Sequence, residues 1–214
     1  MKKSIILSIV VIFVILIIDQ ALKIWVKTDF YLYESVELIG NKVQLHFVEN
    51  PGMAFGMELW GGNIGKILLS IFRIIAIAGL IYFLIQIIKK QQNMILVLCV
   101  SLIIAGAMGN LIDSAFYGLI FNESTTIEKA ILFPESGGYA PFLMGKVVDM
   151  FYCPLFKFPE WLPWLGGQTF FSPIFNVADS AITISVFIAI IFYKKIFKNN
   201  SIKKHETAEN IVIE

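Results

Sequence analysis

Four long apolar runs, separated by more polar segments, dominate the pattern of the chain. They cover about residues 4–26, 64–88, 94–112 and 174–193. A helix needs about 20 predominantly apolar residues to cross roughly 30 Å of hydrocarbon, so each run predicts a membrane-spanning helix. The first run is too long for a signal peptide and lacks a small-residue cleavage site, so we interpret it as an anchor that spans the membrane.

Alternation of apolar and polar residues predicts a strand in the first long connection. Val43, Leu45 and Phe47 are separated by single polar residues, which is typical of a half-buried strand. Residues 50–52 then form a simple turn or a functional strand edge, and residues 53–57 are a candidate returning strand. The predicted fold class is an α-helical polytopic membrane protein with four transmembrane helices and a small β-sheet on the outer membrane surface.

The chain is expected to form one membrane-embedded domain over residues 1–198, followed by a polar tail over residues 199–214. Its outer loops cover about residues 27–63 and 113–173. The second loop is rich in Gly, Pro and aromatic residues. Trp161 and Trp164 in this loop are placed as anchors at the membrane interface would be.

Lysines near the ends of the predicted spans set their orientation, because cytoplasmic loops of membrane proteins carry an excess of Lys and Arg. These lysines gather on one side of the predicted topology: Lys2, Lys3, Lys89, Lys90, Lys194, Lys195 and Lys198. Both termini are therefore expected in the cytoplasm, and both long loops outside.

Composition and charge favour a membrane protein and exclude several other classes. The 214 residues are 57% hydrophobic and 15% charged, against roughly 25% charged residues in soluble domains. A soluble domain of this size would leave large apolar patches in water. The net charge of +1 provides no basic surface for nucleic acid. With two cysteines and two histidines, we expect no metal site and no cofactor, and chemistry that comes from carboxylates.

Aspartates are concentrated at the predicted outer ends of the spans, whereas the glutamates lie in loops and in the tail. Four of the five aspartates lie within or beside apolar sequence: Asp19, Asp113, Asp149 and Asp179. An aspartate at the bilayer centre costs about 2.5–3.5 kcal/mol on insertion scales. Asp19 lies four residues before Lys23 and is expected to pair with it. Asp149 and Asp179 are harder to explain by a structural role alone.

Two asparagine–aspartate pairs have helical spacing. Asn110 lies three residues before Asp113, and Asn176 lies three residues before Asp179, so the members of each pair share a helix face. Small residues over 105–109 would let helices approach closely. Because Asp179 follows the start of the fourth span by about five residues, roughly 8 Å, these polar groups are expected at one depth near the outer leaflet.

A carboxylate pair is the catalytic arrangement that these residues favour. The sequence contains no G-x-S-x-G motif and no histidine beside a serine or cysteine at a suitable depth. Two acids that lie close together in a low-dielectric site share one proton, so that one activates water while the other assists the leaving group. Asp149 and Asp179 are the candidates for this pair, which hydrolyses a peptide bond without a metal ion.

Five ordered motifs resemble those of the lipoprotein signal peptidase (signal peptidase II) family. They are Asp19–Lys23, Asn50–Gly56, Gly106–Asp113, Val147–Met150 and Phe175–Ser180. The resemblance implies an aspartyl endopeptidase of the bacterial inner membrane that cleaves prolipoproteins before their diacylglyceryl-modified cysteine. It also implies contact with membrane phospholipid, sensitivity to the cyclic peptide globomycin, no nucleic-acid partner and a monomeric chain.

The resemblance further implies roles for individual residues. Asp149 and Asp179 would be the catalytic pair, and Asp19 with Lys23 would stabilise the site. The residues that would shape the site and bind substrate are Asn50, Gly52, Asn110, Asp113, Asn176 and Ala178.

The chain departs from the family pattern at two places. The family has an arginine after the aspartate that matches Asp113, whereas this chain has Ser114, so Arg73 or Lys146 is a candidate replacement. About residues 114–145 form an insertion before Asp149, which we expect to be a peripheral elaboration of the outer surface.

Two other function classes use the same residues. A small multipass transporter or a proton or cation relay also needs acids in the membrane, but it would place them at successive depths rather than at one. A membrane scaffold would explain the small residues but not the acids in apolar surroundings.

Overall fold

The computed structural model describes residues 1–51, 62–154, 156–164, 166–167, 169–170 and 173–196. They form two compact units. The first unit takes its described residues from 1–17, 74–108 and 178–214, and the second from 18–73 and 109–177. The predicted returning strand over 53–57 and the whole predicted polar tail over 199–214 lie outside the described residues.

Three of the four predicted spans are helices that are long and apolar enough to cross a membrane. They are α1 (Lys2–Asp29), α2 (Gly62–Lys89) and α3 (Met94–Ile112) with its helical continuation to Ile120. The fourth apolar helix, α5 (Val177–Ile191), has only 15 residues. It starts later than the predicted residue 174 because residues 174–175 pair in a sheet, and the count of four spans is therefore not confirmed.

The helix of the third span does not end at residue 112 as predicted. Asp113–Tyr117 continues it as a π-helical segment, and α4 (Gly118–Ile120) adds one more turn. Asp113 and Ser114 thus lie inside a helix rather than at the start of a loop, and both are buried. The apolar residues after Ser114 support this continuation, and π-helical turns of this kind often occur at functional sites.

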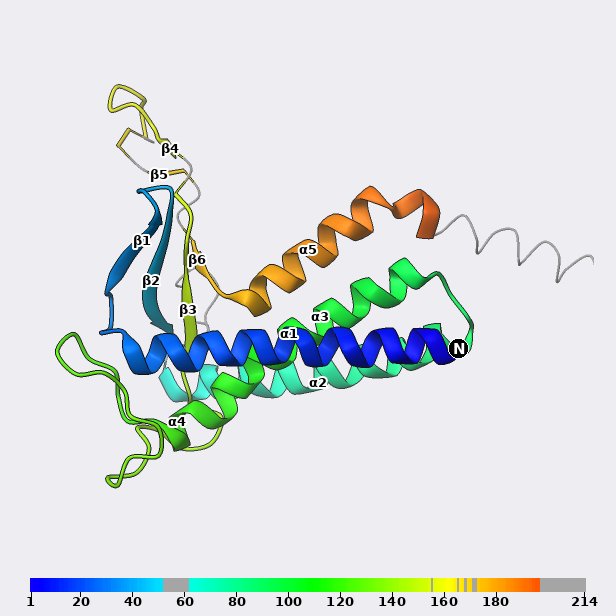
Figure 1. Ribbon diagram of the computed structural model, residues 1–214, viewed down its shortest axis with the longest axis horizontal. Helices are drawn as coiled ribbons and strands as arrows, with labels where there is room; N and C mark the ends of the chain where they lie inside the picture. Colours follow the sequence, from blue (N-terminus) through cyan, green and yellow to red (C-terminus); the bar gives the residue numbers. More distant parts are fainter. Residues whose placement is uncertain (52–61, 155, 165, 168, 171–172, 197–214) are drawn as a thin grey trace, which may run out of the picture. The chain divides into compact units, whose positions relative to one another are not determined.

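A four-stranded antiparallel sheet forms part of the second unit, in the order β1-β2-β3-β6 (Figure 1). Its strands are β1 (Ser35–Ile39), β2 (Val43–Asn50), β3 (Val147–Tyr152) and β6 (Ile174–Phe175). The strand predicted from the alternation at residues 43–47 is confirmed, with Leu45 and Phe47 on its buried side. Its partners are β1 and β3, which sequence reasoning did not propose as strands.

A second, two-stranded ribbon joins β4 (Phe156–Lys157) and β5 (Thr169–Phe170). Trp161 and Trp164 lie between these strands in the sequence and are 78% and 95% exposed. Their place at the membrane interface stays a prediction.

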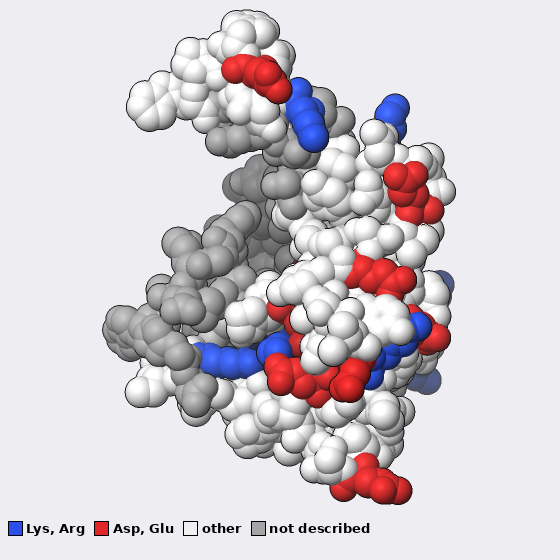
Figure 2. Space-filling view, turned by 90° about the vertical axis from the view of Figure 1, so that its left-hand side faces the viewer, with Lys and Arg blue, Asp and Glu red and all other residues white. Residues whose placement is uncertain are grey.

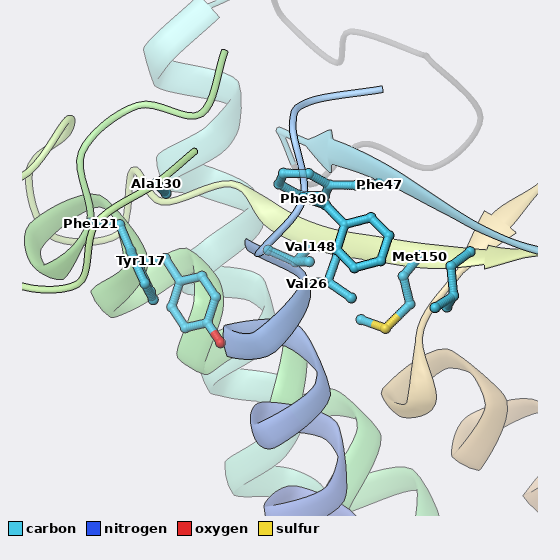
Figure 3. Packing of buried hydrophobic residues seen from close by; sticks show 9 residues of the cluster. Val26, Phe30, Phe47, Tyr117, Phe121, Ala130, Val148 and Met150 are labelled. Atoms are coloured by element: carbon cyan, nitrogen blue, oxygen red, sulfur yellow. The ribbon is translucent and has the colours of Figure 1, made fainter. Parts of the chain in front are cut away.

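The core of the second unit includes residues of the insertion, so its predicted peripheral character is wrong. Phe121 is fully buried and Ala130 nearly so, and both belong to the same buried cluster as Val26 and Phe47 (Figure 3). Backbone hydrogen bonds tie the insertion in as well, because Leu32 N–H donates to the Thr125 carbonyl at 3.0 Å. The insertion is a structural part of this unit.

Small residues bring helices together in the first unit, as their spacing predicts. A Cβ atom on Gly106 would overlap the backbone oxygen of Ala178 and the side chain of Ile182. Nearby, the Ser185 hydroxyl donates to the Cys99 carbonyl at 2.9 Å. Gly106 therefore allows α3 and α5 to pack closely.

The buried insertion leads to a stability prediction. Replacing Phe121 by Ala should lower the free energy of unfolding by about 3–5 kcal/mol, because it removes a buried ring and leaves a cavity. Phe133→Ala is the matched control, because Phe133 is 72% exposed in the same insertion. Urea unfolding in detergent micelles measures both, and equal stability of the two variants would contradict the buried role of Phe121.

Candidate active site

A buried lysine between two buried aspartates lies at one end of the candidate site. The Lys23 ammonium lies 2.9 Å from Asp19 Oδ2 and 2.8 Å from Asp113 Oδ2, and all three side chains are inaccessible to solvent. The predicted Asp19–Lys23 pair is confirmed, and Asp113 is a second partner that the sequence did not suggest. Helix α1 supplies the first two residues one turn apart, and the π-helical segment supplies the third.

Gln20 connects the two aspartates and was missed by sequence reasoning. Its amide nitrogen donates to Asp19 Oδ2 at 3.1 Å and to Asp113 Oδ1 at 2.9 Å. The Tyr117 hydroxyl donates in turn to Gln20 Oε1 at 3.1 Å. The signal that could have identified Gln20 is a second polar side chain directly after Asp19 in an apolar helix.

A chain of hydrogen bonds leads from Lys23 to Asp149. The Lys23 ammonium donates to Asn110 Oδ1 at 2.9 Å, and the Asn176 amide donates to the same oxygen at 3.1 Å. The Asn176 amide nitrogen also lies 2.7 Å from Asp149 Oδ1. All four side chains, which the sequence singled out on four separate segments, are therefore parts of one hydrogen-bonded network.

Asp149 is held on β3 by amide groups. Its Oδ2 accepts from the Asn50 amide at 3.3 Å, so each carboxylate oxygen has an asparagine donor. Asp149 is 5% exposed. An amide donor orients a carboxylate without neutralising its charge.

On the edge of β3 that faces away from β2, side chains rather than a strand contact the backbone next to Asp149 in the described part of the chain. Strand β6 pairs with β3 only at Phe151 and Tyr152. At Val148, the backbone N–H donates to Asp113 Oδ2 at 3.2 Å and the carbonyl accepts from Asn176 at 3.3 Å. These two contacts satisfy buried backbone groups that would otherwise be costly, and they fix the strand next to the carboxylate.

The remaining predicted site residues lie elsewhere. Ala178 is buried and Asp179 half-buried, both in the first turn of α5, and both belong to the first unit, whereas Asp149 belongs to the second. Asn176 directly precedes this helix. Gly52 lies outside the described residues.

Arg73 contacts the serine that stands where the family has arginine. The Arg73 guanidinium donates to Ser114 Oγ at 3.0 Å, and the Ser114 hydroxyl donates to the Asn110 carbonyl at 3.0 Å. Lys146, the other candidate, pairs with Glu49 and Glu123. Of the two predicted replacements, Arg73 is the one that contacts Ser114.

A second buried ion pair lies beside the network, and it corrects the prediction that the glutamates lie in loops. Glu49 lies on β2 with its side chain 3% exposed and pairs with Lys27, whose side chain is fully buried. Lys146 Nζ lies 3.2 Å from the other Glu49 oxygen. Burial alone would raise the pKa of Glu49, but its contacts with Lys27, Ser124 and Lys146 together outweigh this effect and lower the pKa. Lysine and acidic side chains also lie next to one another on the face shown in Figure 2.

These contacts suit acid–base chemistry at Asp149. The carboxylate is nearly buried and oriented from both oxygens, as a general acid or base requires. Among the residues that the structure describes, no group of three or more His, Cys, Asp or Glu side chains is placed to hold a metal ion.

Comparisons with known proteins agree with this geometry. Residues 11–195 match the family described as Signal peptidase (SPase) II. The chain is 48% identical to a lipoprotein signal peptidase of Porphyromonas gingivalis, over 85% of this chain and 80% of that protein. It is 35% identical to one of Amoebophilus asiaticus, over 90% and 79% of the two chains.

A solved bacterial membrane enzyme has a similar fold. A bacterial membrane enzyme solved by the in meso method at 2.3 Å resolution has a TM-score of 0.59 and 28% identity to this chain. The alignment covers 93% of this chain and 92% of that enzyme.

The Lys23 contacts predict a large loss of stability when the ammonium is removed. Lys23→Met leaves Asp19 and Asp113 buried without their shared cation, and breaking a buried pair in this way costs about 3–5 kcal/mol. Lys42→Met is the control, because Lys42 is exposed at the turn between β1 and β2. Urea unfolding in micelles measures both, and near-wild-type stability of Lys23→Met would contradict the role of the ammonium.

The buried ion pair of Glu49 is expected to stabilise the fold by an amount that depends on pH. Because its folded pKa lies below the ordinary value of 4.5, the stabilisation is present above that value and is lost as the pH falls through the folded pKa. Glu49→Gln should cost roughly 3 kcal/mol at neutral pH and progressively less in acid. Unfolding of both proteins as a function of pH tests this, and a difference that persists in strong acid would argue against it.

Proposed function

The chain belongs to the signal peptidase II family, peptidases that remove signal peptides from prolipoproteins, and from this we propose how its aspartates cleave the peptide bond. The substrate is a prolipoprotein that carries a diacylglyceryl group on the cysteine after the scissile bond. Asp149 and Asp179 form the catalytic pair. The family places the chain among peptidases rather than transporters or relays.

One observation carries the assignment of this pair. Asn176 binds the Asp149 carboxylate at 2.7 Å and stands directly before α5, whose first turn contains Asp179. A residue that orients one acid thus begins the segment that carries the other. This supports a pair of acids acting together.

The reaction needs only the two carboxyl groups and water. The ionised acid accepts a proton from water as the water oxygen attacks the carbonyl carbon of the scissile bond. The protonated acid donates a hydrogen bond to the carbonyl oxygen and then transfers its proton to the departing cysteine nitrogen. The C–N bond breaks, and the pair again holds one proton.

The other site residues orient this pair or bind substrate. Asn50 and Asn176 orient Asp149 through their amides. Asn110 joins Asn176 to Lys23, and the two acids around Lys23 stabilise the site. Gly52 and Ala178 are proposed to contact the substrate or shape its binding site, as their matches to the family motifs imply.

The family and the apolar helices identify a bacterial inner-membrane protein. We place both termini in the cytoplasm, because the lysines cluster at the predicted cytoplasmic ends of the spans. The active site then lies near the outer leaflet, where the lipid of the substrate stays in the bilayer. Residues 1–198 act as one peptidase domain, as a monomer in contact with phospholipid, and globomycin inhibits it.

A cleavage assay tests the catalytic pair. Purified protein in detergent or liposomes should remove the signal peptide from a diacylglyceryl-modified prolipoprotein. Asp149→Asn and Asp179→Asn should fold but lose at least about 1,000-fold in kcat, because each removes an acid that takes part in proton transfer. Gel mobility of the product measures this.

Two controls accompany the assay. Asp29→Asn alters an exposed aspartate at the end of α1 and should keep wild-type activity. Cleavage should also persist in the presence of a chelator. Full activity of either active-site variant would overturn the pair, and activity lost to chelator but restored by divalent ions would overturn the metal-free reaction.

A further inference from the structure

Glu49 lies on strand β2 directly before Asn50, and its side chain contacts the insertion. One Glu49 oxygen pairs with Lys27 and accepts from the Ser124 hydroxyl at 2.8 Å. The other oxygen lies 3.2 Å from Lys146 Nζ. Of its three partners, Ser124 lies in the insertion and Lys146 directly follows it, just before β3.

The insertion also encloses the cation that pairs with Glu49. The Lys27 ammonium lies 5.2 Å from the centre of the Phe121 ring and 5.1 Å from that of Tyr139. It donates to Ser124 Oγ at 2.9 Å. Cation–π contacts of this kind are strongest where water is excluded, and the Lys27 side chain is fully buried. Folding of the insertion therefore completes the environment of the Lys27–Glu49 pair.

The position of Glu49 on β2 connects this pair to the candidate active site. Between Leu45 and Val48 the pairing of β2 with β3 is irregular. Beyond that point, three residue pairs join the strands in the part of the chain that the structure describes, namely Val48 with Asp149, Glu49 with Val148 and Asn50 with Val147. A ladder this short holds its end weakly by itself, and a bulge permits it to bend.

Glu49 and Asn50 are neighbours whose side chains point to opposite faces of the strand. On one face, Glu49 is fixed by two lysines and a serine. On the other, the Asn50 amide donates to Asp149 Oδ2 at 3.3 Å. Anchoring the Glu49 side chain thus fixes the backbone from which Asn50 reaches the carboxylate.

We propose that Glu49, held by Lys27, Ser124 and Lys146, is a positioning residue for the Asp149 carboxylate and acts through Asn50. The insertion serves the reaction by anchoring the strand at its site-proximal end. This inference rests on the proposed function, because it concerns the same carboxylate. It assigns a catalytic purpose to contacts that would otherwise contribute only to stability.

Kinetics of the full-length protein in micelles distinguish positioning from stability. We compare wild type with Glu49→Gln, Asn50→Ala and the double variant, using a diacylglyceryl-modified prolipoprotein below the unfolding temperature of every variant. Rates are expressed per folded molecule. Glu49→Gln should lower kcat about 10- to 100-fold, as expected for a misplaced catalytic group, with KM within about threefold of wild type.

The double variant tests the route through Asn50. If Glu49 acts through Asn50, adding Glu49→Gln to Asn50→Ala should lower kcat by no more than about twofold further, because coupled residues are not additive. Independent effects would multiply and would overturn the proposal. A purely structural role would leave kcat per folded molecule of Glu49→Gln at the wild-type value, which would overturn it as well.

Two further variants keep the test decisive. Glu123→Gln is the matched control, because Glu123 also contacts Lys146 but its side chain is 64% exposed; it should retain wild-type kcat. Ser124→Ala keeps both ion pairs and should lower kcat about fivefold, the equivalent of about one hydrogen bond. If Glu49→Gln fails to fold, wild-type kcat in Ser124→Ala overturns the proposal. Absence of cleavage by the wild-type protein would instead overturn the proposed function, and this inference with it.

Discussion

The contact on which the candidate site depends is the buried Lys23 ammonium between Asp19 and Asp113. Three charged side chains without solvent exposure are tolerated only when each charge is paired and its remaining hydrogen-bonding capacity is used. Here Lys23 also donates to Asn110, and Gln20 donates to both aspartates. The polar groups at the ends of α1 and α3 therefore form a satisfied network, and removing its cation leaves two acids without compensation.

Hydrogen bonds from this network hold strand β3 in place. Asp113, one of the two acids bound to Lys23, accepts from the backbone N–H of Val148. Asn176, which shares the Asn110 oxygen with Lys23, binds the Val148 carbonyl and the Asp149 carboxylate. The residue before Asp149 is thus held through its backbone, and Asp149 through its side chain. The same charges that stabilise the helices fix the carboxylate proposed to act on the substrate.

Sequence patterns predicted the local elements better than their partners. The alternation at 43–47 identified a strand, but Glu49 was expected in a loop, whereas it lies buried on the same strand. What the pattern lacked was Ser124, which lies 75 residues away from Glu49. Likewise, ending the third span before Asp113 treated a charge as a helix boundary, although a lysine from another helix compensates that charge. Whether a charged residue is buried depends on partners that are distant in sequence, and the hydrophobic periodicity of a segment carries no information about such partners.

The buried acids in and around the candidate site have two kinds of partner, lysine ammonium groups and asparagine amides. Asp19, Asp113 and Glu49 are each paired with lysine, and a buried carboxylate that is paired in this way holds its neighbours in place. Asp149 is held from both oxygens by asparagine amides, which fix its orientation but leave its charge in place. Lysine thus pairs with acids that support the fold, and asparagine amides orient the acid that is proposed to react.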